Sequence, residues 1–321
     1  MIGNVPFRRR LLPVLSAFAL VAGCSIVPAP AQVGRFALTG QGSVNTFWLG
    51  AKRGLIVIDT QRSLTDARGA VTELRRAGQP IVAILVTHPH PDHVGGLGVL
   101  HEAFPDAPIY ASRSTIDHIR TDPLGFYDRT RSQPGSDYAA ELTVPDQVVA
   151  PNATVEAGGT TVQSAEFGEG ESATSTVYYE PRSRALFAGD LVANRATPDL
   201  LEGHSCSWLT QLDRLQERFP DARFLYPGHG KLGDATELID AQRDYLRQFR
   251  RLVGAAIAAD SPSGAEVGHV EIQDLLEELG KRYPDYPSAT TLPTLAEENV
   301  IAVAKELAAE DPAGLPAACR G

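Results

Sequence analysis

The feature that most constrains this chain is the segment THPHPDH, residues 87–93, which is dense in metal-binding residue types. The apolar, β-branched run 81–86 precedes it, which is typical of a strand buried on both faces. A helix-like stretch follows and extends to Phe104. In a turn at the end of a buried strand, polar side chains can face water while the strand holds them in place. The segment therefore predicts a rigid functional site.

The spacing within this segment favours two adjacent metal ions over one. His88 and His90 can reach a common point if the backbone between them is extended. Asp92 and His93 follow once the chain has turned, and they can point toward a neighbouring position. A single histidine at a strand end is usually an ordinary polar residue. Four ligand-type residues within six positions are hard to explain by packing, so we interpret the segment as a metal site.

The pattern His-x-His-x-Asp-His after a strand resembles the signature of the metallo-β-lactamase superfamily. Two later segments strengthen the resemblance. Asp190 follows the apolar run 185–187 and matches the aspartate that bridges two metals in that family, and His229 in the segment YPGHG matches its final histidine ligand. The resemblance covers residues 34–233. It implies an α/β fold, the four-layer αββα sandwich, here with a helical C-terminal extension over residues 234–321.

One family position departs from the pattern. Where the superfamily has Gly-His-Thr/Ser, this chain has Gly170-Glu171-Ser172, so a glutamate stands at the position of the third histidine ligand. Glu171 can itself be a ligand, with Glu169 as a nearby competitor. Alternatively, the first metal site is incomplete, or the fold is reused for binding without catalysis. We favour Glu171 as a ligand, because every other ligand position is intact. A carboxylate would weaken the metal as a Lewis acid and make manganese or iron more acceptable beside zinc.

The resemblance implies a ligand set for two metal ions, expected to be zinc, with Asp190 bridging them. The first ion would be held by His88, His90 and Glu171, and the second by Asp92, His93 and His229. A metal-bound hydroxide would then attack the carbonyl carbon of an ester, lactone, thioester or amide in a small-molecule substrate.

Three further residues are candidates for roles in catalysis or binding. Asp92 is expected to orient the hydroxide or carry its proton. His204 could orient substrate, donate a proton or replace the missing ligand, unless it merely lies beside a helix cap at Ser205. Lys231 could hold a substrate carboxylate, although surface lysines are common.

Two other functions remain open. The fold could serve a non-catalytic or degenerate lipoprotein that binds a ligand or partner. A redox member of the superfamily is ranked low, because no flavin-binding partner domain is visible.

The N-terminus has the pattern of a bacterial lipoprotein signal. A basic stretch, residues 8–10, precedes the short apolar run 11–22, and small residues lead directly into Cys24. We expect residues 1–23 to be removed, Cys24 to be acylated and residues 24–33 to form a tether. Acylation of Cys24 would anchor the protein to a membrane of the cell envelope. No aspartate follows Cys24, which by resemblance to lipoprotein sorting rules implies the outer membrane, with the protein facing the periplasm.

Net charge argues against one class of partner, and the cysteine content permits a disulfide. The formal net charge is −10, which gives no electrostatic attraction to nucleic acid. Besides Cys24, the chain has Cys206 and Cys319. An oxidising compartment permits a disulfide between them, but the sequence cannot show that they meet.

The remaining segments are assigned from periodicity. Residues 121–146 are expected to be an irregular loop that shapes the pocket or packs on itself. Residues 148–149, 153–155 and 160–166 are expected to form antiparallel strands. Helices are expected over 234–260, 270–282 and 295–309, where they could cap the site or support a homodimer.

Overall fold

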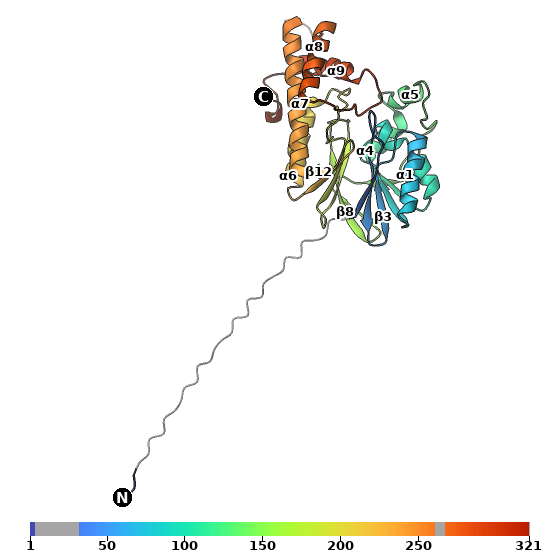
Figure 1. Cartoon of the computed structure of the whole chain (residues 1–321), viewed down its shortest axis with the longest axis vertical. Coiled ribbons are helices and arrows are strands. Elements are labelled where there is room, and N and C mark those ends of the chain that lie inside the picture. The colour runs from blue at the N-terminus through green and yellow to red at the C-terminus, as the bar shows by residue number, and fades with distance from the viewer. Residues whose placement is uncertain (4–31, 261–266, 321) are drawn as a thin grey trace.

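The computed structural model describes residues 1–3, 32–260 and 267–320. Two six-stranded sheets lie face to face, and helices cover the outer face of each sheet (Figure 1). The expected αββα sandwich is therefore confirmed. The expected N-terminal signal and Cys24 lie outside the described residues.

The first sheet has the strand order β1-β2-β3-β4-β5-β6. Its strands are β1 (Val33–Phe36), β2 (Thr46–Ala51), β3 (Gly54–Ile58), β4 (Ile81–Leu85), β5 (Ile109–Ser112) and β6 (Gln147–Val149). The first three are antiparallel to one another, whereas β3 to β6 run parallel. The outer face carries α1 (Leu64–Arg76), α3 (Leu97–Ala103) and α4 (Arg113–Thr121).

The second sheet has the order β12-β11-β10-β9-β8-β7. Its strands are β7 (Thr154–Ala157), β8 (Thr160–Phe167), β9 (Ser175–Glu180), β10 (Ala185–Gly189), β11 (Phe224–Pro227) and β12 (Gly233–Asp234). Only β10 and β11 pair in parallel. Helix α6 (Ser205–Arg218) connects them and packs on the outer face of this sheet.

Alternating side chains of β3 explain why both faces of the first sheet are apolar. Leu55 and Val57 pack toward the helices, and Ile56 and Ile58 pack toward the second sheet, where they join Phe187 of β10. Because successive strand residues point to opposite faces, one apolar strand supplies two cores.

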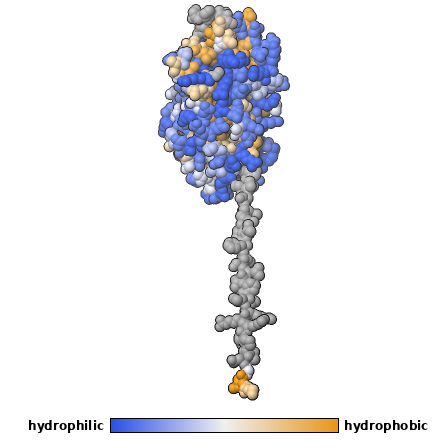
Figure 2. Space-filling model, turned by 90° about the vertical axis from the view of Figure 1, so that its left-hand side faces the viewer, coloured by the Kyte–Doolittle hydropathy of each residue, from blue (hydrophilic) through white to orange (hydrophobic). Residues whose placement is uncertain are grey.

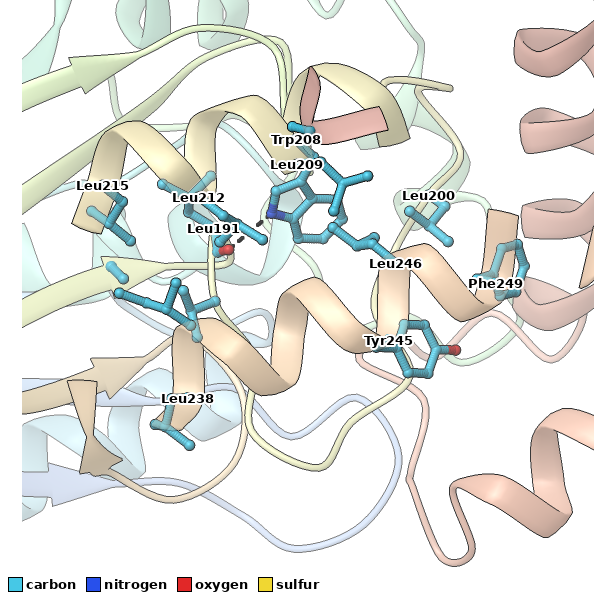
Figure 3. Close-up of a cluster of buried hydrophobic side chains, with 14 of the residues drawn as sticks. Leu191, Leu200, Trp208, Leu209, Leu212, Leu215, Leu238, Tyr245, Leu246 and Phe249 are labelled. Carbon is cyan, nitrogen blue, oxygen red and sulfur yellow. Dashed lines mark hydrogen bonds between the residues drawn. The ribbon is translucent and has the colours of Figure 1, made fainter. Parts of the chain in front are cut away.

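The C-terminal helices extend the core of the second sheet. These are α7 (Ala235–Asp260), α8 (His269–Arg282) and α9 (Leu295–Ala309). Trp208 of α6 is fully buried in the same apolar cluster as Leu246 and Phe249 of α7, and its indole nitrogen donates to the carbonyl of Leu191 at 2.9 Å (Figure 3). The helical extension thus shares one core with the sandwich.

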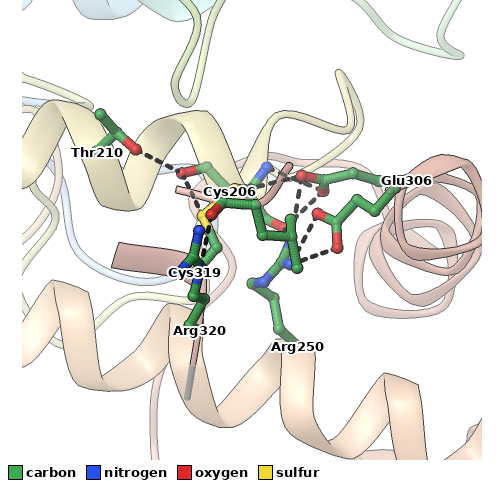
Figure 4. Close-up of a disulfide and its surroundings, with 9 residues drawn as sticks. Cys206, Thr210, Arg250, Glu306, Cys319 and Arg320 are labelled. Atoms are coloured by element: carbon green, nitrogen blue, oxygen red, sulfur yellow. Dashed lines mark hydrogen bonds and ion pairs between the residues drawn. A yellow bond between two sulfur atoms is a disulfide. The ribbon is translucent and has the colours of Figure 1, made fainter. Parts of the chain in front are cut away.

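A buried ionic cluster and a disulfide fasten α9 and the C-terminus to the start of α6 (Figure 4). The carboxylate of Glu306 accepts hydrogen bonds from the backbone nitrogens of Ser205 and Cys206, at 3.0 and 2.8 Å. These are free donors at a helix N-terminus, where negative charge is favourable. Arg250 contacts the same carboxylate at 3.2 Å. Cys206 and Cys319 form a disulfide, so the pairing that the sequence left open is present.

Two expectations for the middle of the chain were wrong. The supposedly irregular stretch 121–146 contains the helix α5 (Phe126–Arg131). Residues 147–149 pair in parallel with β5 in the first sheet, not with the antiparallel strands of the second. A strand this short has too little pattern to specify its partner, and the preceding loop brings it to the other sheet.

The surface view shows a mostly hydrophilic face, with hydrophobic residues gathered toward the end formed by the C-terminal helices (Figure 2). Among the described residues, no helix has both the length and the apolar character needed to span a membrane.

Candidate metal centre

Loops at one end of the two facing sheets bring the candidate ligands together. Residues 88–93 follow β4 and enter the short helix α2 (Pro91–Val94). Glu171 lies in the loop between β8 and β9, Asp190 directly follows β10, and His229 follows β11. The ends of parallel strands meet at the same edge of a sheet, so residues far apart in sequence converge there.

Three buried side chains form the first cluster, His88, His90 and Glu171. Nδ1 of His90 lies 2.8 Å from Oε1 of Glu171, and Nε2 of His88 lies 3.4 Å from Oε2 of the same residue. Glu171 is only 2% exposed, which is costly for a carboxylate without a charged partner. The structure thus places Glu171 where the third histidine was expected.

Four buried side chains form the second cluster, Asp92, His93, Asp190 and His229. Nε2 of His229 lies 2.9 Å from Asp190 and 3.3 Å from Asp92. Nε2 of His93 lies 3.2 Å from the other oxygen of Asp190. The two clusters adjoin, because Nε2 of His88 is 4.0 Å from Asp190. This position is compatible with a carboxylate shared between two metals.

The donor set fits metal ions because most of its inward atoms face one another without making a hydrogen bond. Among the described residues, the buried atoms without a hydrogen bond include Nε2 of three site histidines and a carboxylate oxygen of each of three site acids. These residues are His88, His93, His229, Asp92, Glu171 and Asp190. Buried polar atoms are nearly always satisfied, so a convergent set of unpartnered ones indicates a ligand. Imidazole nitrogens and carboxylate oxygens suit zinc, and the carboxylates also suit manganese or iron.

The histidines and carboxylates of the site shift one another's pKa values. Burial lowers the pKa of His93, but Asp190, Asp92 and Asp59 outweigh it and hold that pKa well above its usual range. Burial raises the pKa of Glu171 to about 8, against the opposing pull of His90. These shifts show carboxylates in need of nearby positive charge, which bound metal ions would supply.

Outer partners orient three of the histidines. Asp59 lies 2.8 Å from Nδ1 of His93 and also accepts from the hydroxyl of Thr87. That hydroxyl must then accept from Nδ1 of His88, 2.9 Å away. Nδ1 of His229 donates to the carbonyl of Ser43 at 2.6 Å. In each ring the other nitrogen, Nε2, is left free to face the site, which is how ligand histidines are fixed in metal sites.

His90 is oriented in the opposite sense. Its Nε2 donates to Glu202 at 2.9 Å, and its Nδ1 faces Glu171. The side chain of Glu202 is only 5% exposed. Sequence reasoning missed both Glu202 and Asp59 as orienting residues. Asp59 could have been predicted as an orienting residue, because it lies at the end of a buried strand. No sequence pattern indicates this role for Glu202, which lies 112 residues from His90.

Close packing explains the glycine in the segment YPGHG. A Cβ on Gly228 would lie 1.7 Å from a carboxylate oxygen of Asp190 and 3.0 Å from the ring of His93. No side chain fits there without displacing a candidate ligand.

The other sequence candidates lie outside both clusters. His204 sits at the N-cap of α6 with its side chain 27% exposed, 3.9 Å from Glu202 and 3.7 Å from Glu169. Neither it nor Ser205 caps that helix through its side chain, because Glu306 fills that role. Lys231 is exposed and does not line the pocket beside the clusters.

A pocket opens beside the clusters and reaches His90, Asp92, Glu171 and Asp190. Phe126 of α5, Leu201 and Leu292 give it apolar walls, so α5 and the segment before α9 help to shape it. A concave, partly apolar site next to convergent polar groups is typical of a small-molecule site.

The chain is similar in sequence to proteins named as metallo-beta-lactamases. An enzyme of Bacteroides fragilis named metallo-beta-lactamase type 2 is 27% identical over 172 residues, which are 53% of this chain and 61% of that protein. The type 2 enzyme of Elizabethkingia meningoseptica is 22% identical over 61% of this chain and 72% of its own length. The matched region thus spans less than two thirds of the Bacteroides protein.

Solved structures show the same architecture. A metallo-beta-lactamase from Pontibacter korlensis is 25% identical, with a TM-score of 0.52 over 68% of this chain and 95% of that one. The BLEG-1 B3 metallo-beta-lactamase is 23% identical, with a TM-score of 0.55 over 65% and 97% of the two chains, and this likeness concerns the fold alone.

The family model described as the metallo-beta-lactamase superfamily matches residues 39–229, which include every candidate ligand. Together with the αββα sandwich and the two ligand clusters at its edge, this match shows that the chain belongs to the metallo-beta-lactamase superfamily.

Proposed function

We propose that this protein is a metal-dependent hydrolase that cleaves an ester, lactone, thioester or amide of a small molecule. The observation that supports it most strongly is the pair of adjoining clusters with unpartnered inward atoms. Two metal ions bound there would activate water and polarise the substrate carbonyl.

In this reaction, residues of the chain would have three roles: metal binding, contact with the substrate or water, and exclusion of bulk water. His88, His90 and Glu171 would hold one metal, and Asp92, His93 and His229 the other, with Asp190 between them. Asp92 also lines the pocket, so its carboxylate can contact a substrate or the water that attacks it. The apolar wall at Phe126, Leu201 and Leu292 would exclude bulk water from the reacting carbonyl.

Hydrolysis of a substrate panel tests this proposal. The panel contains aryl esters, lactones, thioesters and amides, including β-lactams because the relatives are named for them. We expect turnover of at least one class, reduced at least about 100-fold in Asp92→Ala and in His90→Ala. The matched controls Asp106→Ala and His101→Ala remove exposed residues of the same types and should keep full activity.

If metal-loaded protein hydrolyses none of these substrate classes, the results would favour the alternative function. In that case the protein would be a superfamily lipoprotein that binds a ligand without catalysis. Activity that survives Asp92→Ala and His90→Ala would place the reaction elsewhere on the molecule.

We also propose that the protein is anchored to the outer membrane through acylated Cys24 and faces the periplasm. The Cys206–Cys319 disulfide supports an oxidising compartment. Labelling cells with an alkyne fatty acid should tag the wild type but not Cys24→Ala, and fractionation should find the tagged protein with the outer membrane.

A further inference from the structure

One carboxylate in the pocket belongs to neither of the two metal clusters. Asp199 lies in the segment between β10 and α6, and it lines the pocket together with Asp92, Glu171 and Asp190. Those three are candidate metal ligands, whereas Asp199 is not. Asp199 is only 7% exposed. A buried carboxylate is costly unless positive charge or hydrogen-bond donors satisfy it, so its place in a pocket indicates a ligand that supplies them.

The protein satisfies only one oxygen of Asp199. Oδ1 accepts a hydrogen bond from the backbone nitrogen of Leu201 at 2.8 Å. Among the described residues, no donor bonds Oδ2, and no arginine, lysine or histidine nitrogen lies within 4.0 Å of either oxygen. The imidazole of His90 lines the same pocket, but its two nitrogens face Glu171 and Glu202. Oδ2 is therefore the atom that Asp199 offers to a ligand.

The C-terminal extension holds the backbone on both sides of Asp199. Asn299 of α9 is fully buried, and its side-chain oxygen accepts from the backbone nitrogen of Leu200 at 2.8 Å. The side-chain nitrogen of Asn299 donates to the carbonyl of Pro198 at 2.9 Å. The carboxylate is thus preorganised at the pocket wall, and a ligand does not have to order it on binding.

The charge of this carboxylate is not balanced by the protein. Burial raises the pKa of the Asp199 carboxyl to about 6, against the opposing pull of His90 and of the hydrogen bond from Leu201. The carboxyl is therefore ionised at neutral pH, with no cationic side chain in contact. A ligand that brings positive charge would offset the cost of burial, whereas an anionic ligand would add to it.

We propose that Asp199 binds a protonated amine of the substrate, so that the enzyme acts on carbonyl compounds that carry an ammonium group. The reactive carbonyl would lie at the metal clusters, the ammonium at Oδ2 of Asp199, and the apolar part against Phe126 and Leu201. An ammonium supplies both a full charge and hydrogen-bond donors, and Oδ2 has neither from the protein. This inference rests on the proposed hydrolase function, whose substrate class it narrows.

Binding of simple thiols tests Asp199 without relying on turnover. Metal-loaded protein is titrated by calorimetry with ω-aminoalkanethiols of two to five methylenes and with the ω-hydroxyalkanethiols of the same lengths. The thiolate binds the metals in every compound, so each pair differs only in its ammonium or hydroxyl group. We expect the best amine to bind the wild type about 10-fold to 100-fold more tightly than its alcohol.

Asp199→Asn keeps the size of the side chain and an acceptor for the backbone of Leu201, but removes the charge. It should abolish the preference for the amine and leave affinity for the alcohols unchanged, which also shows that the variant is folded and holds metal. The control Asp106→Asn removes the same charge from an exposed position between α3 and β5, and it should keep the whole preference.

Equal binding of amine and alcohol by the wild type would overturn the assignment. A preference that persists in Asp199→Asn would also overturn it, because the metals rather than Asp199 would then bind the amine. Failure to bind any thiol of the series counts against it in the same way. A protein that shows the preference but hydrolyses no substrate would keep the ammonium site and lose the hydrolase function, and a hydrolase without the preference would do the reverse.

Discussion

The imidazole of His90 is held between two carboxylates, with Glu171 2.8 Å from Nδ1 and Glu202 2.9 Å from Nε2. Glu171 belongs to the first candidate metal cluster, and Glu202 lies behind the ring. Glu171 would therefore share the first metal with His90, while Glu202 fixes the tautomer that leaves Nδ1 of His90 free to bind that metal.

Replacement of Glu202 tests this arrangement. Glu202→Gln keeps the size of the side chain but removes the charge that favours Nε2–H on His90. We expect metal affinity at the first cluster to fall about 10-fold. Competition with a chromophoric chelator measures it. The control is Glu169→Gln, whose side chain is 58% exposed and also lies near His204. Equal affinities in wild type and Glu202→Gln would show that the contact does not matter for metal binding.

Replacement of Glu171 tests the altered ligand. Glu171→Ala should bind one metal ion fewer per chain, because the first cluster then keeps only two histidines. Glu171→His should restore the count and raise the preference for zinc over manganese, since imidazole is the softer ligand. Competition between the two metals, followed by elemental analysis, measures both. An unchanged metal count in Glu171→Ala would exclude Glu171 as a ligand.

Gly228 tests the packing of the second cluster. Gly228→Ala places a methyl group where it collides with the carboxylate of Asp190. We expect this variant to lose metal from the second cluster and at least about 100-fold in activity, because ligand geometry tolerates little displacement. Gly280→Ala on α8, where a Cβ meets nothing within 4 Å, is the control and should behave as wild type. Full metal content in Gly228→Ala would contradict the geometry.

The disulfide is expected to stabilise the C-terminal helices on the sandwich. It closes a loop of 113 residues, so its removal in Cys319→Ser should cost about 2–4 kcal/mol of unfolding free energy. Chemical denaturation measures it. Adding reductant should destabilise the wild type by the same amount and leave Cys206→Ser/Cys319→Ser unchanged. Equal stability of wild type and Cys319→Ser would show that Glu306 and Arg250 suffice to hold α9.

The parts of the molecule that could be predicted are those encoded locally. The buried strand before His88 and the spacing up to His93 place four candidate ligands in one turn, and apolar strands likewise precede Asp190 and His229. The helix over 295–309 was predicted with its observed bounds, because its apolar residues recur at helical spacing.

The parts that could not be predicted depend on contacts across the fold. Glu202 meets His90 only because α9 holds the start of α6 and the segment before it, where Asn299 bonds the backbone at Leu200. The partner of β6 and the disulfide likewise depend on which loops cross between the layers. The periodicity of the sequence does not specify these long-range contacts.

Metal content per chain decides whether the two clusters bind two metal ions. Protein purified without added metal is analysed by elemental analysis, with the Asp92→Ala and Glu171→Ala variants beside it. We expect about two equivalents of metal in the wild type and a lower content in each variant. A wild type that binds no metal, even after zinc or manganese is supplied, would contradict it.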